Sequence, residues 1–370
     1  MNGIKILHAA DLHLDSPFEG LPEHKAAQRR RAQRELLSKI VQTAEDEKVA
    51  LILLAGDLLD SDSTYTETAE EIKKAFGATD IPVFIAPGNH DFYGRRSPYA
   101  TIDFPENVHV FKSAGLEYVE LHEPGVRVWG AAFTDIYSKP LLEGFSADKK
   151  AGVYDLMCIH GEVGKASQYN AVSEDDIKTS GMDYIALGHI HKESGLKKAG
   201  GTYYAWPGCP EGRGFDECGE KHVYVVELSD GGCAIKPVSV ARSRYMILPV
   251  TVGDDFSPEK LGGLLPDDTT NDIYRIILRG ETEKAPDMKA LSDALEDRFF
   301  SLQLRDETTL RRDIWESAGA DNLKGQFLQR LRVKYDAAKT DEERETITQA
   351  VRWGLAALCN GEEVVSHEDK

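Results

Sequence analysis

The sequence lacks the long apolar runs and the cysteine patterns that mark several classes of protein. No stretch approaches the roughly 20 apolar residues that a helix needs to cross a bilayer. The opening residues, MNGIKILHAADLHLD, turn polar too early for a secretory signal peptide. Five cysteines are scattered without a CxxC pair, which predicts neither a disulfide framework nor a zinc knuckle. We therefore expect a reduced, cytoplasmic protein that does not associate with membranes.

Positive charge is also in short supply. The formal net charge is −19, which argues against a large nucleic-acid surface because phosphate binding requires Lys and Arg. A local basic patch is still an alternative, since residues 24–34 read HKAAQRRRAQR. This stretch is either a solvated helix face or a set of phosphate contacts. A site built around metal ions would in any case bring its own positive charge.

The chain of 370 residues is too long for one compact core and predicts two or three units. Short apolar runs alternate with helical patterns in the first part, as in an α/β layered fold. A small α+β pattern follows, and then a helical end. The predicted strands are IKILHAA, VALILLAG, IPVFIAPG, VHVFK, VRVWGAAF, DLMCIHG, DYIALGH, TYYAWPG and HVYVVELS. The predicted domains are 1–241, 242–307 and 308–370.

The helical end, residues 308–370, carries an apolar stripe along its last predicted helix. Such a stripe packs on its own domain or docks a partner. The sequence leaves both uses open.

Metal-type side chains follow five of the predicted strands. DLH follows the first, GDLLD the second and GNHD the third, and two later strands end in IHG and GHIH. His189 and His191 face one point, because residues i and i+2 of extended backbone point the same way. The carboxyl ends of strands are also where open α/β sheets build their sites. The candidate ligands are Asp11, His13, Asp57, Asn89, His160, His189 and His191.

This ligand set predicts the kind of metal and the kind of chemistry. It mixes carboxylate, imidazole and amide oxygen without any thiolate, which suits Mn²⁺ or Fe²⁺, with Zn²⁺ as an alternative. There are enough ligands for two ions. Two ions about 3.5–4 Å apart clamp the attacking and leaving oxygens of an in-line displacement at phosphorus. We expect two divalent ions, with Mn²⁺ preferred, and hydrolysis of a phosphoester.

The ordered set D-x-H, GD-x-x-D, GNH-D, H and GH-x-H, over roughly residues 4–225, resembles the calcineurin-like metallophosphoesterases. The resemblance implies a four-layer α/β fold, a metallophosphoesterase β-sandwich flanked by helices. It implies that Asp57 bridges two ions. The first ion would be held by Asp11, His13 and His191, and the second by Asn89, His160 and His189.

The same resemblance implies a catalytic pair beside the ions. His90 would donate to the phosphate or to the leaving oxygen, and the Asp60 carboxylate would orient it. Asp60 as a helix N-cap is the alternative. For Asp91, a supporting role behind the ligands and a capping role are equally open.

Longer stretches are similar to the SbcD/YhaO group of DNA repair exonucleases: HAADLHLDSPFEGL, SGMDYIALGHIHK and WPGCPEGRGFDECGEKHVYVVEL. In that group a small α+β capping domain and then partner-binding helices follow the phosphoesterase domain, which is the order of parts seen here. Glu211, Arg213 and Glu217 would border the active site or brace the capping domain, or would belong to a plain strand–turn–strand. Asp60 departs from SbcD proper, which usually has histidine there, and agrees with the YhaO branch.

The resemblance implies a metal-dependent phosphodiesterase, a DNA exonuclease or endonuclease that acts in repair. Its partner would be an SMC-like ATPase of the SbcC/YhaN type, bound through the C-terminal helices. A homodimer through helices of the first domain is also implied, with residues 23–47 as one candidate region. Two other functions stay open. A phosphatase or phosphodiesterase for small substrates is favoured by the acidic charge, and a catalytically silent scaffold is disfavoured by the intact ligand set.

Overall fold

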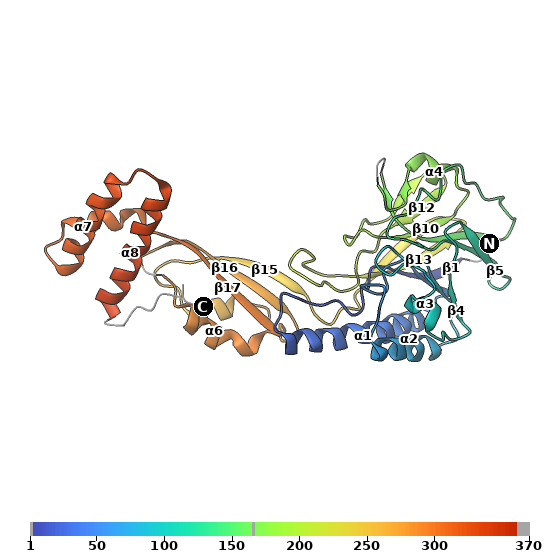
Figure 1. The fold of residues 1–370 in the computed structure, drawn as a ribbon, viewed down its shortest axis with the longest axis horizontal. Coiled ribbons are helices and arrows are strands. Elements are labelled where there is room, and N and C mark those ends of the chain that lie inside the picture. The colour runs from blue at the N-terminus through green and yellow to red at the C-terminus, as the bar shows by residue number, and fades with distance from the viewer. Residues whose placement is uncertain (1–2, 165–166, 284, 361–370) are drawn as a thin grey trace. The chain divides into compact units, whose positions relative to one another are not determined.

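The computed structural model describes residues 3–164, 167–283 and 285–360. The chain forms two compact units, residues 1–244 and 245–370, which are described separately (Figure 1). The predicted division into three domains stays a prediction, and residues 361–370 of its third segment lie outside the described residues. Within the described part of the chain, no helix combines the length and the apolarity that crossing a membrane requires.

The first unit contains a mixed six-stranded sheet in which the first strand is central. Four strands, β1 to β4, run parallel, the next strand at the edge pairs antiparallel with β1, and the outermost strand pairs antiparallel with that one. In spatial order the strands are β14 (Gly232–Val238), β13 (Val223–Ser229), β1 (Ile4–Ala9), β2 (Leu51–Leu54), β3 (Val83–Ile85) and β4 (Val108–Val110).

A second six-stranded sheet completes the β-structure of this unit, together with a short pair, β8 (Glu162–Val163) and β9 (Ala171–Val172). Its central strands are parallel, and its two edge strands are antiparallel to their neighbours. The spatial order is β11 (Lys197–Ala199), β12 (Thr202–Ala205), β10 (Tyr184–Gly188), β7 (Tyr154–His160), β6 (Val126–Gly130) and β5 (Glu117–Leu121).

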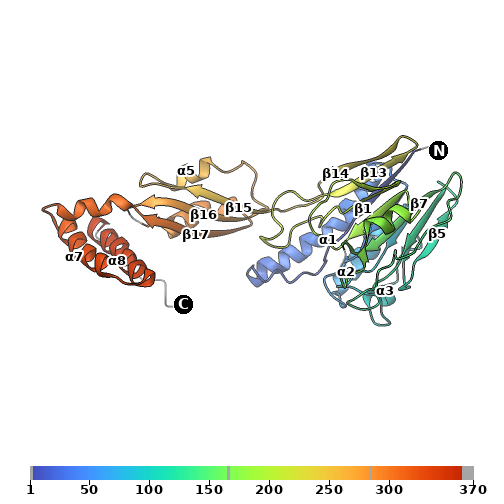
Figure 2. The ribbon, with the colours of Figure 1, turned by 90° about the horizontal axis from the view of Figure 1, so that it is seen from above.

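The two sheets pack face to face. On each sheet, every second residue of the buried strands places an apolar side chain against the other sheet. Ile4 and Ile6 of β1 share one buried cluster with Leu156 and Cys158 of β7. Continuous apolar strands of this kind are expected where both faces of a parallel sheet are buried. Figure 2 shows the two sheets of this unit as stacked layers.

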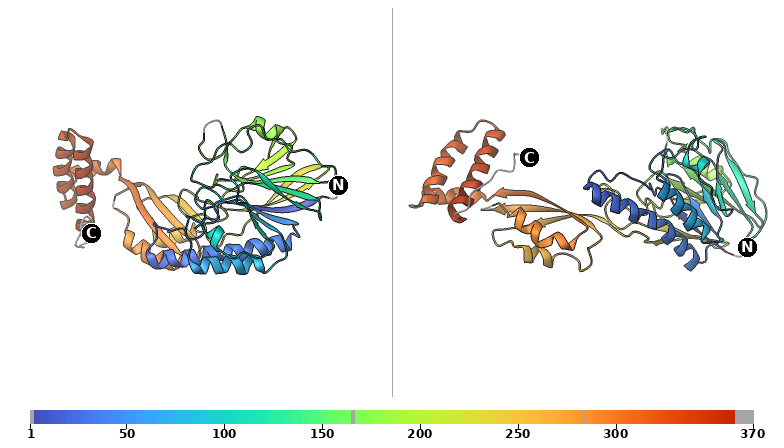
Figure 3. Two further views of the ribbon diagram at one scale, coloured as in Figure 1. Left: turned by 45° about the vertical axis from the view of Figure 1, so that its right-hand side comes forward. Right: turned by 60° about the horizontal axis from the view of Figure 1, so that its bottom comes forward.

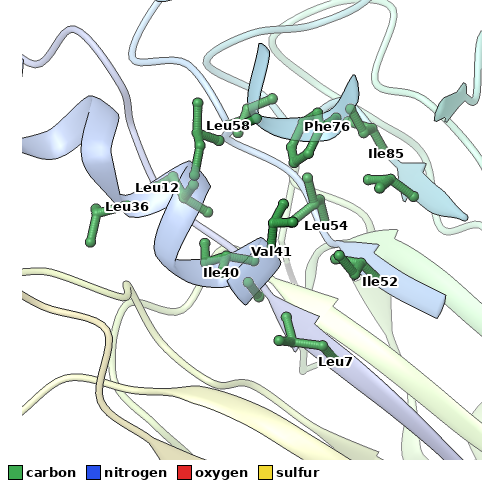
Figure 4. Close-up of a cluster of buried hydrophobic side chains, with 14 of the residues drawn as sticks. Leu7, Leu12, Leu36, Ile40, Val41, Ile52, Leu54, Leu58, Phe76 and Ile85 are labelled. Atoms are coloured by element: carbon green, nitrogen blue, oxygen red, sulfur yellow. The ribbon is translucent and has the colours of Figure 1, made fainter. Parts of the chain in front are cut away.

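Helices cover the outer faces of both sheets. α1 (Glu23–Asp46) and α2 (Thr66–Gly77) pack on the first sheet, and Leu36 and Ile40 of α1 belong to one buried cluster with Leu7 and Ile52 of the sheet (Figure 4). α4 (Glu174–Thr179) contributes Ile177 to the cluster on the second sheet, and α3 (Pro98–Thr101) is a single turn. The predicted α/β fold class, a four-layer sandwich flanked by helices, is confirmed for this unit.

The second unit begins with a three-stranded parallel sheet and ends in helices. β15 (Tyr245–Thr251) and β17 (Ser301–Leu310) flank β16 (Ile273–Thr282), and α5 (Pro258–Gly263) and α6 (Met288–Leu295) pack on one face. Short 3-10 turns span Glu296–Arg298 and Arg312–Gly319. The last two helices, α7 (Leu323–Ala337) and α8 (Asp341–Asn360), lie side by side in both views of Figure 3.

The helix starts of this unit follow sequence signals. Ser257 caps α5 by accepting a hydrogen bond from the backbone N–H of Lys260, with proline next in the chain. Thr340 Oγ1 accepts from Glu343 N at 3.1 Å, and the Glu343 carboxylate accepts from Thr340 N at 3.4 Å. These contacts form a reciprocal capping box before α8.

Candidate metal centre

Five strands of the first unit end at one place. β1, β2 and β3 of one sheet and β7 and β10 of the other bring their carboxyl ends together, because the two sheets pack with these strands parallel within each sheet. The turns that follow carry every ligand predicted from the sequence. These residues are Asp11, His13, Asp57, Asn89, His160, His189 and His191.

The ligand atoms of these residues converge in overlapping groups. Each of three groups has its carboxylate oxygens and imidazole nitrogens within 4.8 Å of one another. Asn89 joins them, since its Oδ1 lies 2.9 Å from His160 Nε2 and 3.2 Å from His189 Nδ1. The groups are Asp11, His13 and His191; His13, Asp57 and His90; and Asp11, Asp57 and His160.

The atoms that face one another fit divalent cations. His13 Nε2 and His191 Nε2 are only 3.2 Å apart, and Asp57 Oδ2 lies 3.6 Å from the former. Asp57 Oδ2 also lies 3.3 Å from His160 Nε2, so it reaches both halves of the cluster. Oxygen and imidazole donors without thiolate are the donors that Mn²⁺, Fe²⁺ and Zn²⁺ share. The residues present therefore fit divalent ions, and Asp57 lies within reach of both halves of the cluster.

Unusual backbone conformation lets these side chains converge. Asp11, His13, Asp57 and His189 have φ angles of 54°, 46°, 50° and 93°, in the left-handed region that is uncommon for residues other than glycine. Each such residue costs of order 1–3 kcal/mol and persists only where the surrounding structure fixes it. The backbone at the strand ends is thus strained in a way that aims the ligands at one point.

Two glycines make room for the ligands. A Cβ atom at Gly56 would lie 2.1 Å from His160 Nδ1, and one at Gly88 would lie 2.2 Å from Asp57 Oδ1. Gly56 also has φ +91°. Any larger residue at either position would displace a ligand.

Neighbouring charges push the pKa values of the buried groups apart. Burial raises the pKa of Asp11, and the Asp57 carboxylate acts in the same direction. At His160 burial acts to lower the pKa, but Asp57 and Asp11 outweigh it and raise the pKa to about 9. Burial, with the charge of His160, lowers the pKa of His189 to about 4. Two buried carboxylates side by side need compensating positive charge, and divalent ions supply it.

The structure differs from the sequence expectation at Asp60. The backbone carbonyl of Asp60, and not its carboxylate, lies 3.1 Å from His90 Nδ1. The carboxylate Oδ1 lies instead 3.2 Å from His13 Nδ1 and accepts a 3.0 Å hydrogen bond from Arg213. A second donor, Ser16 Oγ, is also 3.0 Å away. These partners turn the carboxylate away from His90, which keeps an exposed position at the edge of the cluster.

Asp91 has a supporting role in the structure. Its carboxylate accepts hydrogen bonds from Gly88 N at 2.7 Å, Leu59 N at 3.0 Å and the Tyr99 hydroxyl at 2.5 Å. Burial, together with the charge of Asp57, raises the pKa of Asp91 to about 6. The residue ties the turn after β2 to the turn after β3, and so it holds two ligand-bearing turns together.

Sequence reasoning did not give Arg213 and Glu217 a contact with the ligands. Glu217 Oε1 lies 2.7 Å from His191 Nδ1, and Arg213 Nη2 donates to the same carboxylate oxygen at 2.9 Å. Their only signal in the sequence was a charged, glycine-rich stretch matching the SbcD/YhaO group. No periodic pattern points from that loop to His191.

The basic stretch of α1 is largely used within the unit. Arg29 forms a buried ion pair with Glu211, and Arg30 pairs with Glu23. Arg34 donates to Thr68 and reaches Asp15 at 3.4 Å. This arrangement favours a structural role for most of the stretch over a continuous phosphate-binding face.

Comparisons with known proteins agree with the site. The calcineurin-like phosphoesterase model matches residues 4–193. The chain is 33% identical to the metallophosphoesterase YhaO of Bacillus subtilis over 243 residues, 62% of this chain and 59% of YhaO. It is 26% identical to the DNA double-strand break repair protein Mre11 of Saccharolobus solfataricus over 238 residues, 61% of each chain. It is 22% identical to the SbcD component of the nuclease SbcCD of B. subtilis over 271 residues, 62% of this chain and 67% of that one.

The match thus spans about three fifths of the length of the first two of these relatives. The family model covers residues 4–193, about half of the chain, and includes all seven candidate ligands. The chain belongs to the calcineurin-like phosphoesterase family.

Proposed function

We propose that this protein is a divalent-metal-dependent phosphodiesterase that cleaves the DNA backbone as the nuclease component of a repair complex. The observation that carries the proposal is the convergence of carboxylate, imidazole and amide donors in overlapping groups at the strand ends. A cluster of this composition suits in-line displacement at phosphorus. The names of Mre11 and of the nuclease SbcCD support a DNA substrate.

The chain's own residues divide the work of this reaction. When bound, two ions, Mn²⁺ by preference, supply positive charge to the phosphoryl oxygens and activate water. Asp57 contacts His13 in one half of the cluster and His160 in the other, and so it fixes the spacing of the two halves. His90 Nδ1 faces the Asp60 carbonyl, which favours a proton on that nitrogen, and the other nitrogen lies at the exposed edge. In the doubly protonated ring, that second N–H is the one that would donate to the phosphate or pass its proton to the leaving oxygen. Recognition of the backbone alone requires no base contact.

A second candidate is a phosphodiesterase or phosphatase that acts on a small substrate. The net charge of −19 and the internal pairing of Arg29, Arg30 and Arg34 favour it, since both reduce attraction for a polyanion. A small substrate, however, gives no role to the 126 residues of the second unit, residues 245–370.

One assay separates these functions. Purified protein with Mn²⁺ would be given linear DNA, nicked DNA, bis-p-nitrophenyl phosphate and a phosphomonoester, with Asp57→Asn as the inactive control. We expect cleavage of DNA and of the small diester. Cleavage of the small diester or of the phosphomonoester with none of any DNA would establish the second candidate, and inertness toward every phosphoester in the assay would refute both.

We also propose that the helices of the second unit bind an SMC-like ATPase. Leu328, Val351 and Leu355 bury one apolar face between α7, α8 and the preceding turn. Other large apolar side chains of these helices remain exposed, with Leu323 68% and Val333 67% accessible. Exposed residues of this size on a helical pair are suited to a partner helix.

Truncation tests this docking role. β17 continues to Leu310, so a chain ending at residue 311 keeps the sheet whole, whereas a cut at residue 308 would shorten the strand. We expect the truncated chain to lose co-purification with the ATPase and to keep its small-diester activity. Loss of that activity would show that the helices are part of the catalytic fold, and retained co-purification would refute the docking role.

A further inference from the structure

Two carboxylates lie close to the Nδ1 atoms of two candidate ligands, on the side of each ring away from the cluster. Glu217 Oε1 lies 2.7 Å from His191 Nδ1, and Asp60 Oδ1 lies 3.2 Å from His13 Nδ1. Glu217 accepts the N–H of the His191 ring, which places the proton of that ring on Nδ1. Asp60 is an electrostatic neighbour of His13, whose Nδ1 makes no hydrogen bond among the described residues. The Nε2 lone pair of His191 is then free, and this atom faces His13 Nε2 at 3.2 Å.

Arg213 joins the two carboxylates. Its Nη1 donates to Asp60 Oδ1 at 3.0 Å, its Nη2 donates to Glu217 Oε1 at 2.9 Å, and its backbone N–H donates to Glu217 Oε2 at 2.8 Å. Nη2 also lies 3.1 Å from His191 Nδ1, farther from that nitrogen than Glu217 Oε1 at 2.7 Å. The planar guanidinium reaches both acceptors at once because its donors form a rigid fork. It also offsets the mutual repulsion of two carboxylates held close to the same cluster.

The imidazoles of the other half of the cluster, His160 and His189, have different partners on their Nδ1 atoms. His160 Nδ1 lies 3.0 Å from the backbone carbonyl of Ala55, which is neutral. His189 turns its Nδ1 inward, 3.2 Å from Asn89 Oδ1. Among the contacts of the described residues, carboxylate oxygens lie within 3.2 Å of the Nδ1 atoms of His13 and His191, whereas Asp11 Oδ1 is 3.9 Å from His160 Nδ1. Carboxylate partners raise the basicity of a ligating imidazole and fix its orientation.

We propose that Arg213 is a positioning residue which, through Asp60 and Glu217, fixes His13 and His191 for binding through Nε2 and makes their ion site the tighter of the two. This inference rests on the proposed two-ion centre. The loop that carries Arg213 and Glu217 makes no direct contact with the substrate in this scheme. It would nevertheless determine the order in which the two ions bind.

The test measures Mn²⁺ binding instead of activity. Free Mn²⁺ is followed by electron paramagnetic resonance during titration of wild type, Arg213→Met and Glu217→Gln. We expect two sites in wild type, and a tighter site weakened 10- to 100-fold in each variant, the usual effect of removing a partner of a ligand. The weaker site should change less than about threefold. In Arg213→Met/Glu217→Gln the losses should not add, because both changes break one network.

Two further variants test whether the loss of Mn²⁺ affinity belongs to the site of His13 and His191. The Asn89→Ala background retains Asp11, His13 and His191, so its remaining site should show the full loss when Arg213→Met is added. Arg242→Met is the matched control, since Arg242 forms an exposed ion pair with Glu35 in the same unit. Its two affinities should equal those of wild type.

The ring nitrogens give an independent readout. In metal-free wild type, ¹⁵N spectra of the histidine rings should show His191 protonated at Nδ1, and Arg213→Met should mix the tautomers of this ring. Glu217→Gln keeps the size of the side chain. If Arg213→Met does not fold, the same Mn²⁺ titration and ¹⁵N spectra of Glu217→Gln decide the question.

Unchanged affinities in both variants, or equal weakening of both sites, would overturn the role of Arg213 while leaving the two-ion centre intact. Failure of wild type to bind Mn²⁺ would overturn the proposed function itself.

Discussion

At the scale of single residues, the site depends on which atom each polar side chain presents. Asp60 shows this most clearly, because its carbonyl faces His90 while its carboxylate faces His13 and Arg213. One residue thus contacts both the proposed acid and a proposed ligand. Substitutions at Asp60 will mix the two effects, so His90 is the cleaner position at which to test proton transfer.

His90→Ala should reduce cleavage most where the leaving group is poor. A general acid contributes typically 10²- to 10⁴-fold to rate, and a DNA alkoxide needs the proton far more than a nitrophenolate does. We expect a loss of about 10²-fold or more on DNA and a much smaller loss on bis-p-nitrophenyl phosphate, from steady-state rates. Equal losses on both substrates would instead indicate that His90 holds an ion, as its place beside His13 and Asp57 allows.

His8 should make the protein sensitive to acid. It is fully buried between the sheets, where its Nδ1 lies 2.9 Å from the Tyr184 hydroxyl, and burial lowers its pKa to about 3. Below pH 6.5 the unfolded chain takes up a proton that the folded chain refuses until about pH 3. The contribution of His8 is therefore complete above pH 6.5 and falls by up to about 1.4 kcal/mol per pH unit below it.

Urea unfolding of wild type and His8→Gln at pH 7, 6 and 5 checks this expectation. The variant should be less stable than wild type at pH 7, and the difference should shrink by about 2 kcal/mol by pH 5. A difference that stays constant with pH would contradict a neutral, buried His8.

At the scale of elements, strands and helices were easier to predict than the contacts between loops. The buried strands of both sheets have continuous apolar runs, which is why β1, β2, β7 and β10 were found from the sequence together with the ligands that follow them. The edge strand β14 was missed because most of its residues are at least partly exposed and it has no such run.

Glu217 was missed as a partner of His191 for a related reason. Its contact joins two loops 26 residues apart, where no period of 2 or 3.6 applies. Ligands placed directly after strands carry a local signal, whereas groups that support them from irregular loops carry almost none.

α1 is anchored by a buried ion pair that should be costly to break. Arg29 donates to Glu211 and Ser243 at 2.8 Å each, and both side chains of the ion pair are 1% exposed. Arg29→Met leaves Glu211 buried without its cation, and removal of one partner of such a pair costs about 3–5 kcal/mol. Urea or thermal unfolding should show this loss.

The double variant Arg29→Met/Glu211→Gln provides the control for this pair, and it should recover part of the stability. Arg30→Met, which removes a pair whose Glu23 carboxylate is 84% exposed, should change stability by less than about 1 kcal/mol. Equal effects of the two single variants would mean that burial of the Arg29 pair is unimportant.

At the scale of the whole molecule, the metal site belongs to one unit. All groups of candidate ligands found among the described residues lie within residues 1–244. Ions that bind only the folded state stabilise it by mass action, by about 2.7 kcal/mol per ion at a concentration 100 times the Kd. The two units should therefore respond differently to metal.

Calorimetry with and without EDTA should reveal two transitions, only one of which depends on metal. Mn²⁺ at 100 times the Kd of both sites should raise the transition of the first unit by about 10–20 °C, given about 2.7 kcal/mol for each of two ions and roughly 2–4 °C per kcal/mol for a domain of this size. The second transition should not move. Asp57→Asn should abolish most of the shift, and a shift of both transitions together would show that the units unfold as one.

The left-handed backbone at Asp11, His13, Asp57 and His189 has an evolutionary consequence. Glycine would relieve the conformational strain at each of these positions. A descendant released from selection for hydrolysis could therefore drift toward glycine there and fold more securely as a pseudoenzyme. This chain has aspartate and histidine, and not glycine, at these four positions. Continued selection for catalysis would keep them there although glycine would favour stability.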